Sequence, residues 1–508
     1  MSTRYLLAHD IGTSGNKATL FTSEGKLLKS VTSEYGTLYF NNNWAEQDPA
    51  LWWAVVCSST QELMQGIDPA SVSVIGLSGQ MMGCLCVDRE GAPLRNALIY
   101  SDQRGVSQAK ALEEAVGSGE FYHITGHRAS ASYSLAKFMW IRDHEPETYR
   151  KTFRILHAKD YINFRLTGRM VTDHSDASGT NAFDLNTLSW SQKILDASGI
   201  DGEKLPPAVR STEVIGELTR EAAALMGLVP GVPVVAGGGD GVCAGVGAGS
   251  VKPGKTYNYL GSSSWIATTT ETPIFDDELR TFVWAHAVPG YFHPCGTMQT
   301  AGSSYAWLKN EICTLEKSDA QRSGSNPYEL INRQIEQSPA GARGLIFLPY
   351  LLGERSPRWN PDAKGAFLGM TLEHKRADVL RSVLEGVTMN LSIILDIFRN
   401  QLPIEEIVVI GGGAKGAVWR QIMADVYGAD VVTPDYLEEA TSIGAAIIGG
   451  VGAGIFPGFE VVDQFLHEES RVRPNVQNAA VYARAKELFE RCYHALEPVF
   501  PALGSTVT

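Results

Sequence analysis

A single carboxylate, Asp240, stands in a glycine-rich stretch where proton-transfer chemistry is possible. Residues 232–249 read VPVVAGGGDGVCAGVGAG, a short β-branched run followed by three glycines and then this acid. The run predicts a buried strand, and the small residues after Asp240 predict a helix that packs closely against its neighbours. An acid just beyond a strand end is where an open α/β sheet places its chemistry. The alternative is a helix N-cap after a glycine turn.

Two glycine-bent hairpins, one in each half of the chain, offer groups that bind phosphate. The first bend is DIGTSGNK, residues 10–17, which joins a strand at 5–8 to another at 18–22. Residues 256–270, TYNYLGSSSWIATTT, repeat this strand–bend–strand design about half a chain later. Such bends present N–H groups and hydroxyls that phosphate oxygens accept. An ordinary polar turn is the alternative for either bend alone, whereas the pair predicts two related lobes that close on one nucleotide.

Charged residues flank the first bend. Lys17 would add positive charge beside a phosphate, and Asp10 could hold a metal ion through water. A second possible phosphate site is the segment 249–256, GSVKPGKT, which matches the P-loop pattern by letter. A P-loop needs a strand before it and a helix after it, and this sequence predicts the reverse order. Because Pro253 also removes an N–H donor, we expect no P-loop at Lys255.

Three further segments place polar or small residues at strand ends. Residues 78–83, SGQMMG, follow a strand predicted at 71–77. Asp102 and Arg104, in SDQR before a helix, could accept from and donate to a polyhydroxyl ligand, or form a surface ion pair. Residues 411–416, GGGAKG, lie between a strand and a helix, which suits close approach to a ring or phosphate and suits tight packing equally well.

Alternating strands and helices predict an α/β fold. Asp48 and Pro49 begin a helix with Leu51, Trp52 and Val55 expected on one face. Other predicted helices follow a cap at Asp160 and cover residues 377–399, 418–427, 438–451 and 481–496. At 508 residues the chain suggests about three domains, with two large ones also allowed. We place the boundary between residues 249 and 255, which divides the chain into 1–249 and 250–508.

Composition restricts the class of partner. The formal net charge is −13 with no Lys/Arg cluster, which argues against nucleic acid and anionic membrane surfaces. The N-terminal segment does not resemble a signal peptide, and no apolar run is long enough for a membrane helix. The seven cysteines form no C-x-x-C pair, and His123 and His127 lack a third metal ligand nearby. We therefore expect a cytoplasmic protein with reduced, mostly buried thiols that acts on a small molecule.

In order along the chain, these motifs resemble those of the FGGY carbohydrate kinases, with the xylulokinases as the closest members. The resemblance spans essentially the whole sequence and rests on DIGTSG, SGQM-x-G, GGGD, LGSS, GERSP, GGGAK and the stretch 365–385. It implies two actin-like (ribonuclease H-like) lobes around a central cleft, and a reaction that uses ATP and Mg²⁺.

The resemblance also implies roles for individual residues. Asp240 would be the general base and Asp10 would serve the metal. The residues implied at the nucleotide and its phosphates are Gly12, Thr13, Ser14, Lys17, Gly261, Ser262, Gly302, Gly412, Gly413 and Lys415. The residues implied around the sugar are Gln80, Met81, Met82, Asp102, Arg104, Asp240 and Gly241.

Two positions depart from the xylulokinase pattern. Met82 replaces the usual His, and Gly241 replaces the usual Asn after the catalytic acid. Loss of two hydrogen-bonding side chains could change the accepted polyol, because polar sites discriminate through such contacts. We expect transfer of the γ-phosphate of MgATP to a ketopentose such as D-xylulose.

Several alternatives stay open. The acceptor could be another polyol, namely ribulose, gluconate, glycerol or erythritol. The chain could instead be an actin- or chaperone-like ATPase without a sugar acceptor. A sugar sensor without activity is disfavoured because Asp10, Lys17 and Asp240 are all present. A homodimer is also an open alternative.

Overall fold

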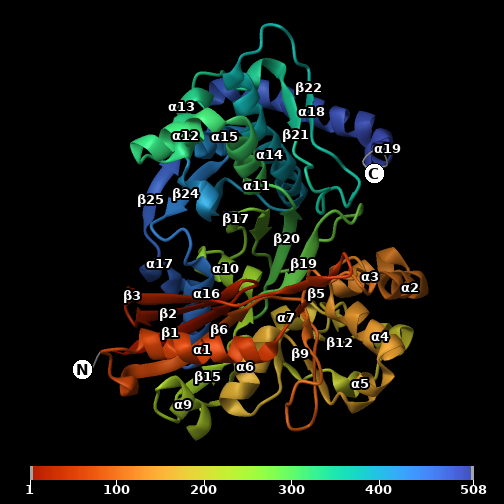
Figure 1. Ribbon diagram of the computed structural model, residues 1–508, viewed down its shortest axis with the longest axis vertical. Helices are drawn as coiled ribbons and strands as arrows, with labels where there is room; N and C mark the ends of the chain where they lie inside the picture. The colour runs from red at the N-terminus through yellow and green to blue at the C-terminus, as the bar shows by residue number, and fades with distance from the viewer. Residues whose placement is uncertain (1–3, 505–508) are drawn as a thin grey trace.

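Two sheets, one in each half of the chain, form the framework of the structure (Figure 1). The computed structural model describes residues 4–504. The first sheet has the order β14-β15-β6-β1-β2-β3, with β16 also paired to β6. Its strands are β1 (Tyr5–Ile11), β2 (Gly15–Thr22), β3 (Leu27–Glu34), β6 (Val72–Gly79), β14 (Val214–Glu217), β15 (Pro233–Val235) and β16 (Gly238–Gly239).

The second sheet has the order β19-β20-β18-β17-β23-β24-β25. Its strands are β17 (Thr256–Leu260), β18 (Ser264–Thr268), β19 (Phe282–Ala285), β20 (Phe292–Met298), β23 (Glu406–Ile410), β24 (Asp430–Pro434) and β25 (Glu468–Val472).

The two sheets share one topology. In the first, the antiparallel strands β3, β2 and β1 continue into the parallel strands β6 and β15, and β14 closes the edge antiparallel. In the second, β20, β18 and β17 continue into the parallel β23 and β24, and β25 closes the edge antiparallel. The predicted pair of related, actin-like lobes is therefore confirmed, and so are both predicted hairpins.

Alternating side chains along the strands bury both faces of the first sheet. Leu7 of β1 packs on one face with helices α1 (Pro49–Leu63) and α6 (Ala158–Thr167). Its neighbours Leu6 and Ala8 point to the opposite face and pack with helices α10 (Asp240–Gly247) and α16 (Ala440–Gly452). A strand buried on both sides is typical of a parallel sheet centre.

Two details of the predicted helices differ in the structure. Asp48 caps α1 as predicted, but Leu51 is 43% exposed, and the buried face is formed by Trp52, Trp53 and Val56. Asp160 is not the N-cap of α6; that residue is His157, and Asp160 lies three positions later, where its carboxylate accepts from the His157 N–H. The acid thus completes a capping box from inside the helix.

Helices α10 and α16 lie between the two sheets and belong to one core with both of them (Figure 1). This core joins Leu6 and Val74 of the first sheet to Tyr257 and Ala267 of the second. Helix α16 comes from the C-terminal half of the sequence but packs against β1 and β6. The division of the chain at residue 249 stays a prediction.

Glycines allow α10 and α16 to approach closely. A Cβ atom at Gly444 would overlap the Cys243 carbonyl, and one at Gly247 would overlap the Ala440 carbonyl. Backbone contact of this kind explains the run of small residues on both helices, because any side chain would push the helices apart.

Further helices surround the two sheets. Helices α14 (Arg376–Arg399), α15 (Ala417–Tyr427) and α18 (Ala479–Leu496) cover the outer face of the second sheet. The others are α2 (Val106–Val116), α3 (Ser118–Thr125), α4 (Ser134–His144), α5 (Pro146–Lys151), α7 (His174–Ser178), α8 (Gln192–Ser198), α9 (Arg220–Met226), α11 (Gly302–Trp307), α12 (Thr314–Ser323), α13 (Pro327–Ile335), α17 (Val462–Phe465) and α19 (Phe500–Gly504).

Small sheets complete the described chain. Their strands are β4 (Leu38–Phe40), β5 (Trp44–Gln47), β7 (Leu85–Val87), β8 (Ala97–Leu98), β9 (Arg154–Leu156), β10 (Thr172–Asp173), β11 (Phe183–Asp184), β12 (Ser189–Trp190), β13 (Ala208–Val209), β21 (Ile346–Leu348) and β22 (Ala366–Leu368). Residues 249–255 lie between α10 and β17, and Thr256 begins β17, so a helix precedes the P-loop-like letters and a strand follows, as predicted. The seven cysteines are free thiols and most are buried, also as predicted. Between residues 4 and 504, no helix combines the length and apolar character needed to cross a membrane.

The contact between α10 and α16 leads to a stability prediction. We expect Gly444→Ala to lower the free energy of unfolding by about 1–3 kcal/mol, because the new methyl group overlaps backbone that must move. Gly119→Ala is the control, since a Cβ at this exposed helical position of α3 meets open space. Thermal unfolding of both variants provides the measurement, and equal midpoints would contradict the tight-contact interpretation.

Candidate active site

The strands β1, β6 and β16 end side by side at one edge of the first sheet. Asp10 of β1 is paired with Ser78 of β6, and Ser78 is paired in turn with Gly238 of β16. Because all three strands run parallel, their carboxyl ends meet at one edge of the sheet. The chain then enters α10, with Asp240 as its first residue.

The predicted carboxylates Asp10 and Asp240 come together at this edge. Burial, together with the nearby charge of Asp10, raises the pKa of Asp240 to about 7. Burial also raises the pKa of Asp10 to about 6. Two carboxyl groups that share a desolvated site each favour the neutral form of the other. Asp240 therefore has a pKa suited to accept a proton near neutral pH.

The helix-cap alternative for Asp240 is wrong. The N-cap of α10 is Gly239, and no side chain caps this end of the helix. Among the residues that the structure describes, Asp240 Oδ1 accepts only a local hydrogen bond, from the Gly241 N–H at 2.7 Å. Its carboxylate lines a cavity instead.

That cavity has a volume of about 520 Å³ and lies between the two halves of the chain. The residues predicted from sequence that line it are Thr13, Gln80, Met81, Met82, Asp240 and Gly241. Met82 has a positive φ of 64° in the turn after β6, and a Cβ at Gly241 would meet open space. The two departures from the xylulokinase pattern therefore both face the cavity.

The other walls of the cavity were not predicted. Its aromatic lining is formed by Tyr100, Tyr133, Trp265, Phe282, Trp284 and Trp359. Its polar lining from the second half includes His293, Thr297, Gln299, Glu354 and Arg355. The second hairpin and the GERSP motif contain Trp265, Glu354 and Arg355, so these three had a sequence signal. The others come from segments without a motif.

The first bend holds its carbonyls fixed and leaves amide hydrogens available. Gly12 N–H donates to Gly15 O at 2.9 Å. Tyr35 Oη and Gln80 Nε2 both donate to Gly12 O, and Gln47 Nε2 donates to Thr13 O. Among residues 4–504, no acceptor is bonded to the N–H groups of Thr13 and Ser14. The bend therefore offers two donors to an anion.

The second bend repeats this arrangement. Gly261 N–H donates to Ser263 O, and Ser262 O accepts from the Ala301 and Ser303 N–H groups, each at 3.0 Å. The N–H groups of Ser262 and Ser263 likewise have no acceptor in the described part of the chain. Gly302 touches the bend so closely that a Cβ would overlap Gly261 O, which explains the glycine at the start of α11.

The glycine turn after β23 packs against the same hairpin. A Cβ at Gly413 would overlap the Leu260 side chain, so tight packing accounts for this glycine, whereas Gly412 faces open space. Lys415 pairs with Glu438 at 2.6 Å. Lys17 Nζ donates to Glu438 O at 3.0 Å and lies 3.5 Å from Glu439. Both predicted phosphate lysines thus contact one acidic segment just before α16.

Comparison with known proteins assigns the family. The N-terminal domain model of the FGGY family of carbohydrate kinases matches residues 5–247, and its C-terminal domain model matches residues 256–453. The xylulose kinase of Bacillus subtilis (strain 168) is 31% identical over 99% of both chains. The chain belongs to the FGGY family of carbohydrate kinases. It is a sugar phosphotransferase, so the chaperone-like ATPase alternative is not retained.

Other FGGY kinases are equally similar. The gluconokinase of Bacillus licheniformis is 32% identical over 99% of this chain and 98% of its own length. The crystal structure of gluconate kinase from Lactobacillus acidophilus superimposes with a TM-score of 0.92 at 27% identity, covering 99% of this chain and 100% of that one. Identity alone therefore does not separate two kinds of acceptor.

In this FGGY kinase, Asp102 and Arg104 lie behind the cavity wall. The Asp102 carboxylate accepts from Arg104 Nε at 2.9 Å and from the Ala45 N–H at 2.7 Å. The Arg104 guanidinium stacks over Trp44 and pairs with Glu46. Both side chains are buried and neither lines the cavity, so the pair is an internal one that fixes the segment before α2. Their predicted contact with sugar stays a prediction.

Another buried cation of the kinase holds two cavity segments together. Lys137 Nζ donates to the carbonyls of Met82 at 3.3 Å and Ala131 at 2.9 Å, and also to that of Ser132. Burial lowers the pKa of Lys137 to about 7. No sequence motif indicates the role of Lys137, because its partners are carbonyl groups of loops that only the fold brings near it.

Proposed function

We propose that this kinase transfers the γ-phosphate of MgATP to a hydroxyl of a ketopentose such as D-xylulose, with Asp240 as general base. The proposal rests on one observation. Asp240 and both bends border the same cavity, and both bends leave amide donors available. In this proposal residues 1–249 supply the sugar site and the first bend, and residues 250–508 supply the nucleotide site.

Phosphoryl transfer requires alignment and charge stabilisation more than covalent help from the protein. Asp240 would take the proton of the attacking hydroxyl as the new bond to phosphorus forms. The N–H groups of Thr13, Ser14, Ser262 and Ser263 would donate to phosphate oxygens. Closure of the lobes would exclude water and limit hydrolysis of ATP.

Asp10 fits the proposed role at the metal. Its Oδ1 is buried without a hydrogen-bond partner among the described residues, and hard cations prefer such oxygens. Mg²⁺, when bound, supplies positive charge that neutralises the phosphates. Gly12, Lys17, Gly261, Gly302, Gly412, Gly413 and Lys415 stay in the proposed nucleotide site as neighbours of the two bends.

A second acceptor class, the sugar acids, is favoured by one observation. Arg355 lines the cavity, its Nε has no hydrogen-bond partner, and its guanidinium forms no ion pair within residues 4–504. A guanidinium of this kind suits a carboxylate, which it can bind through two parallel hydrogen bonds. Relatives named gluconokinase at similar identity agree with this class.

Removal of the proposed base tests the mechanism. We expect Asp240→Asn to lower turnover by about 10²–10⁴-fold while ATP affinity stays within a few-fold, because the amide cannot accept the proton. Asp277→Asn, at an exposed acid that does not line the cavity, is the control. Steady-state kinetics and calorimetric ATP binding measure both quantities. Near-normal turnover in the first variant would remove Asp240 from this role.

The pKa of Asp240 gives a pH dependence. The base acts in its ionised form, which predominates above its pKa of about 7. We therefore expect kcat/KM for the acceptor to rise with pH through about 7 and then level off, since this ratio reports groups that titrate before the acceptor binds. A profile that is flat between pH 5 and pH 9 is incompatible with this assignment.

A panel of acceptors separates the two classes. We expect the highest kcat/KM for D-xylulose in a coupled ADP assay that also includes D- and L-ribulose, gluconate, glycerol and erythritol. Arg355→Met should lower kcat/KM for gluconate at least tenfold and change kcat/KM for D-xylulose little. Only gluconate has a carboxylate that the Arg355 guanidinium can bind. A higher wild-type value for gluconate would replace the ketopentose proposal with the sugar-acid one.

A further inference from the structure

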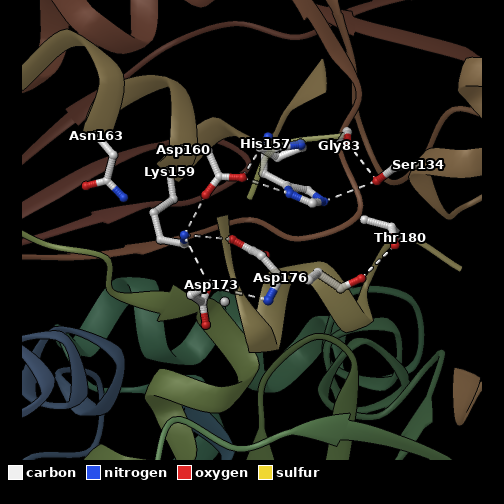
Figure 2. Close-up of polar contacts among 12 residues, drawn as sticks. Gly83, Ser134, His157, Lys159, Asp160, Asn163, Asp173, Asp176 and Thr180 are labelled. Carbon is white, nitrogen blue, oxygen red and sulfur yellow. Dashed lines mark hydrogen bonds and ion pairs between the residues drawn. The ribbon is translucent and has the colours of Figure 1, made fainter. Parts of the chain in front are cut away.

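A fully buried charge cluster lies behind the strand end that leads to Asp240 (Figure 2). Lys159 Nζ lies 2.7 Å from Asp160 Oδ1 and 3.2 Å from both Asp173 Oδ1 and Asp176 Oδ2. Figure 2 shows the lysine side chain reaching toward all three acids, which come from α6 and from the start of α7. Burying a lysine and three acids is costly, so the cluster calls for a specific role.

Metal binding does not explain the cluster. His157, Asp160 and Asp176 place ligand atoms within 4.8 Å of one another. Lys159, however, already pairs with two of these three residues, and His157 is bonded to Asp160 and Ser134. The lysine ammonium is therefore the cation of this site.

Asp173 connects the cluster to the active-site edge. Its Oδ2 accepts from the Ser175 N–H at 2.9 Å, from Ser175 Oγ at 2.6 Å and from Ser211 Oγ at 2.7 Å. Ser175 Oγ in turn accepts from the Gly239 N–H at 2.9 Å. An unbroken chain of contacts thus runs from Lys159 through Asp173 and Ser175 to the residue before Asp240.

Gly239 has few other restraints. Strand β16 contains only Gly238 and Gly239, and it pairs only with β6. Gly239 also lacks a side chain, because a Cβ would overlap the Met81 sulfur on the cavity side. A two-residue strand supplies few pairing bonds of its own, so the bond to Ser175 is a further restraint on where this peptide lies.

We propose that Asp173 and Ser175 are positioning residues for phosphoryl transfer, which hold the Gly239 peptide and thereby set the place of the Asp240 carboxylate in the cavity. The inference rests on the proposed role of Asp240. Lys159 pairs with Asp173 through Oδ1, which leaves Oδ2 to accept from the hydroxyls of Ser175 and Ser211. A displacement of about 1 Å at a catalytic group can cost about 10²-fold in rate.

Two serine variants form a matched pair for the test. Ser175→Ala removes a hydrogen bond to Asp173 and also the link to Gly239. Ser211→Ala removes only a hydrogen bond to the same carboxylate oxygen. We expect kcat to fall about 10–100-fold in the first variant and less than threefold in the second, with KM for ATP unchanged in both. Asp173→Asn keeps the shape of the acid. We expect its loss of kcat to lie between the losses of the two serine variants.

A double-mutant cycle with Asp240→Asn identifies the route of the effect. If Ser175 acts through Asp240, adding Ser175→Ala to Asp240→Asn should lower kcat less than twofold further. Additive losses, or equal kcat in the two serine variants, would overturn the inference and show a role in folding alone. Normal turnover of Asp240→Asn by itself would instead overturn the proposed function, so the two failures are distinguishable.

Discussion

Backbone contact between helices α10 and α16 joins the helix that carries Asp240 to the core shared by both sheets. The helices meet through Gly247 and Gly444, and the core around them reaches both sheets. Helix α10 begins with Asp240, and α16 begins just after the acidic segment that Lys17 and Lys415 contact. Because protein cores are close-packed, this crossing cannot shift without moving the groups at its ends.

A hydrogen-bond chain adds a second link across the lobes. Trp265 Nε1 donates to Tyr257 Oη, which donates to Gly241 O at 2.7 Å. The second sheet thus restrains the first turn of α10 through Gly241, and Ser175 restrains the residue before Asp240, Gly239. Asp240 lies between these two anchors, one contributed by each half of the chain. Polar groups buried in this way are restrained because each lost bond leaves an unsatisfied partner.

Sequence reasoning succeeded where local patterns carry the information. The strands, both hairpins and the rejected P-loop depend on residues close together in the chain, such as the β-branched run before Gly237. The repeated topology followed from two bends of similar design. Glycines at 302 and 413 were assigned through the family resemblance, and only the structure shows that each one touches the second hairpin.

Sequence reasoning failed where distant segments decide the environment. Leu51 was expected to share one face of α1 with Trp52 and Val55, but tertiary packing exposes Leu51 and buries Trp53 and Val56. The sugar contact of the Asp102–Arg104 pair stays a prediction, but sequence reasoning did not foresee that Trp44 and Glu46, some sixty residues earlier, enclose the pair. Lys137 and Ser175 carry no motif at all, because their partners are backbone groups brought near only by the fold.

The aromatic wall of the cavity has an evolutionary consequence. Five of its six residues lie outside the two bends and outside α10, namely Tyr100, Tyr133, Phe282, Trp284 and Trp359. Mutations in these segments can therefore remodel the pocket for a new metabolite while the phosphate-handling frame stays intact. Substrate specificity can therefore diverge among descendants of this protein before the fold itself changes.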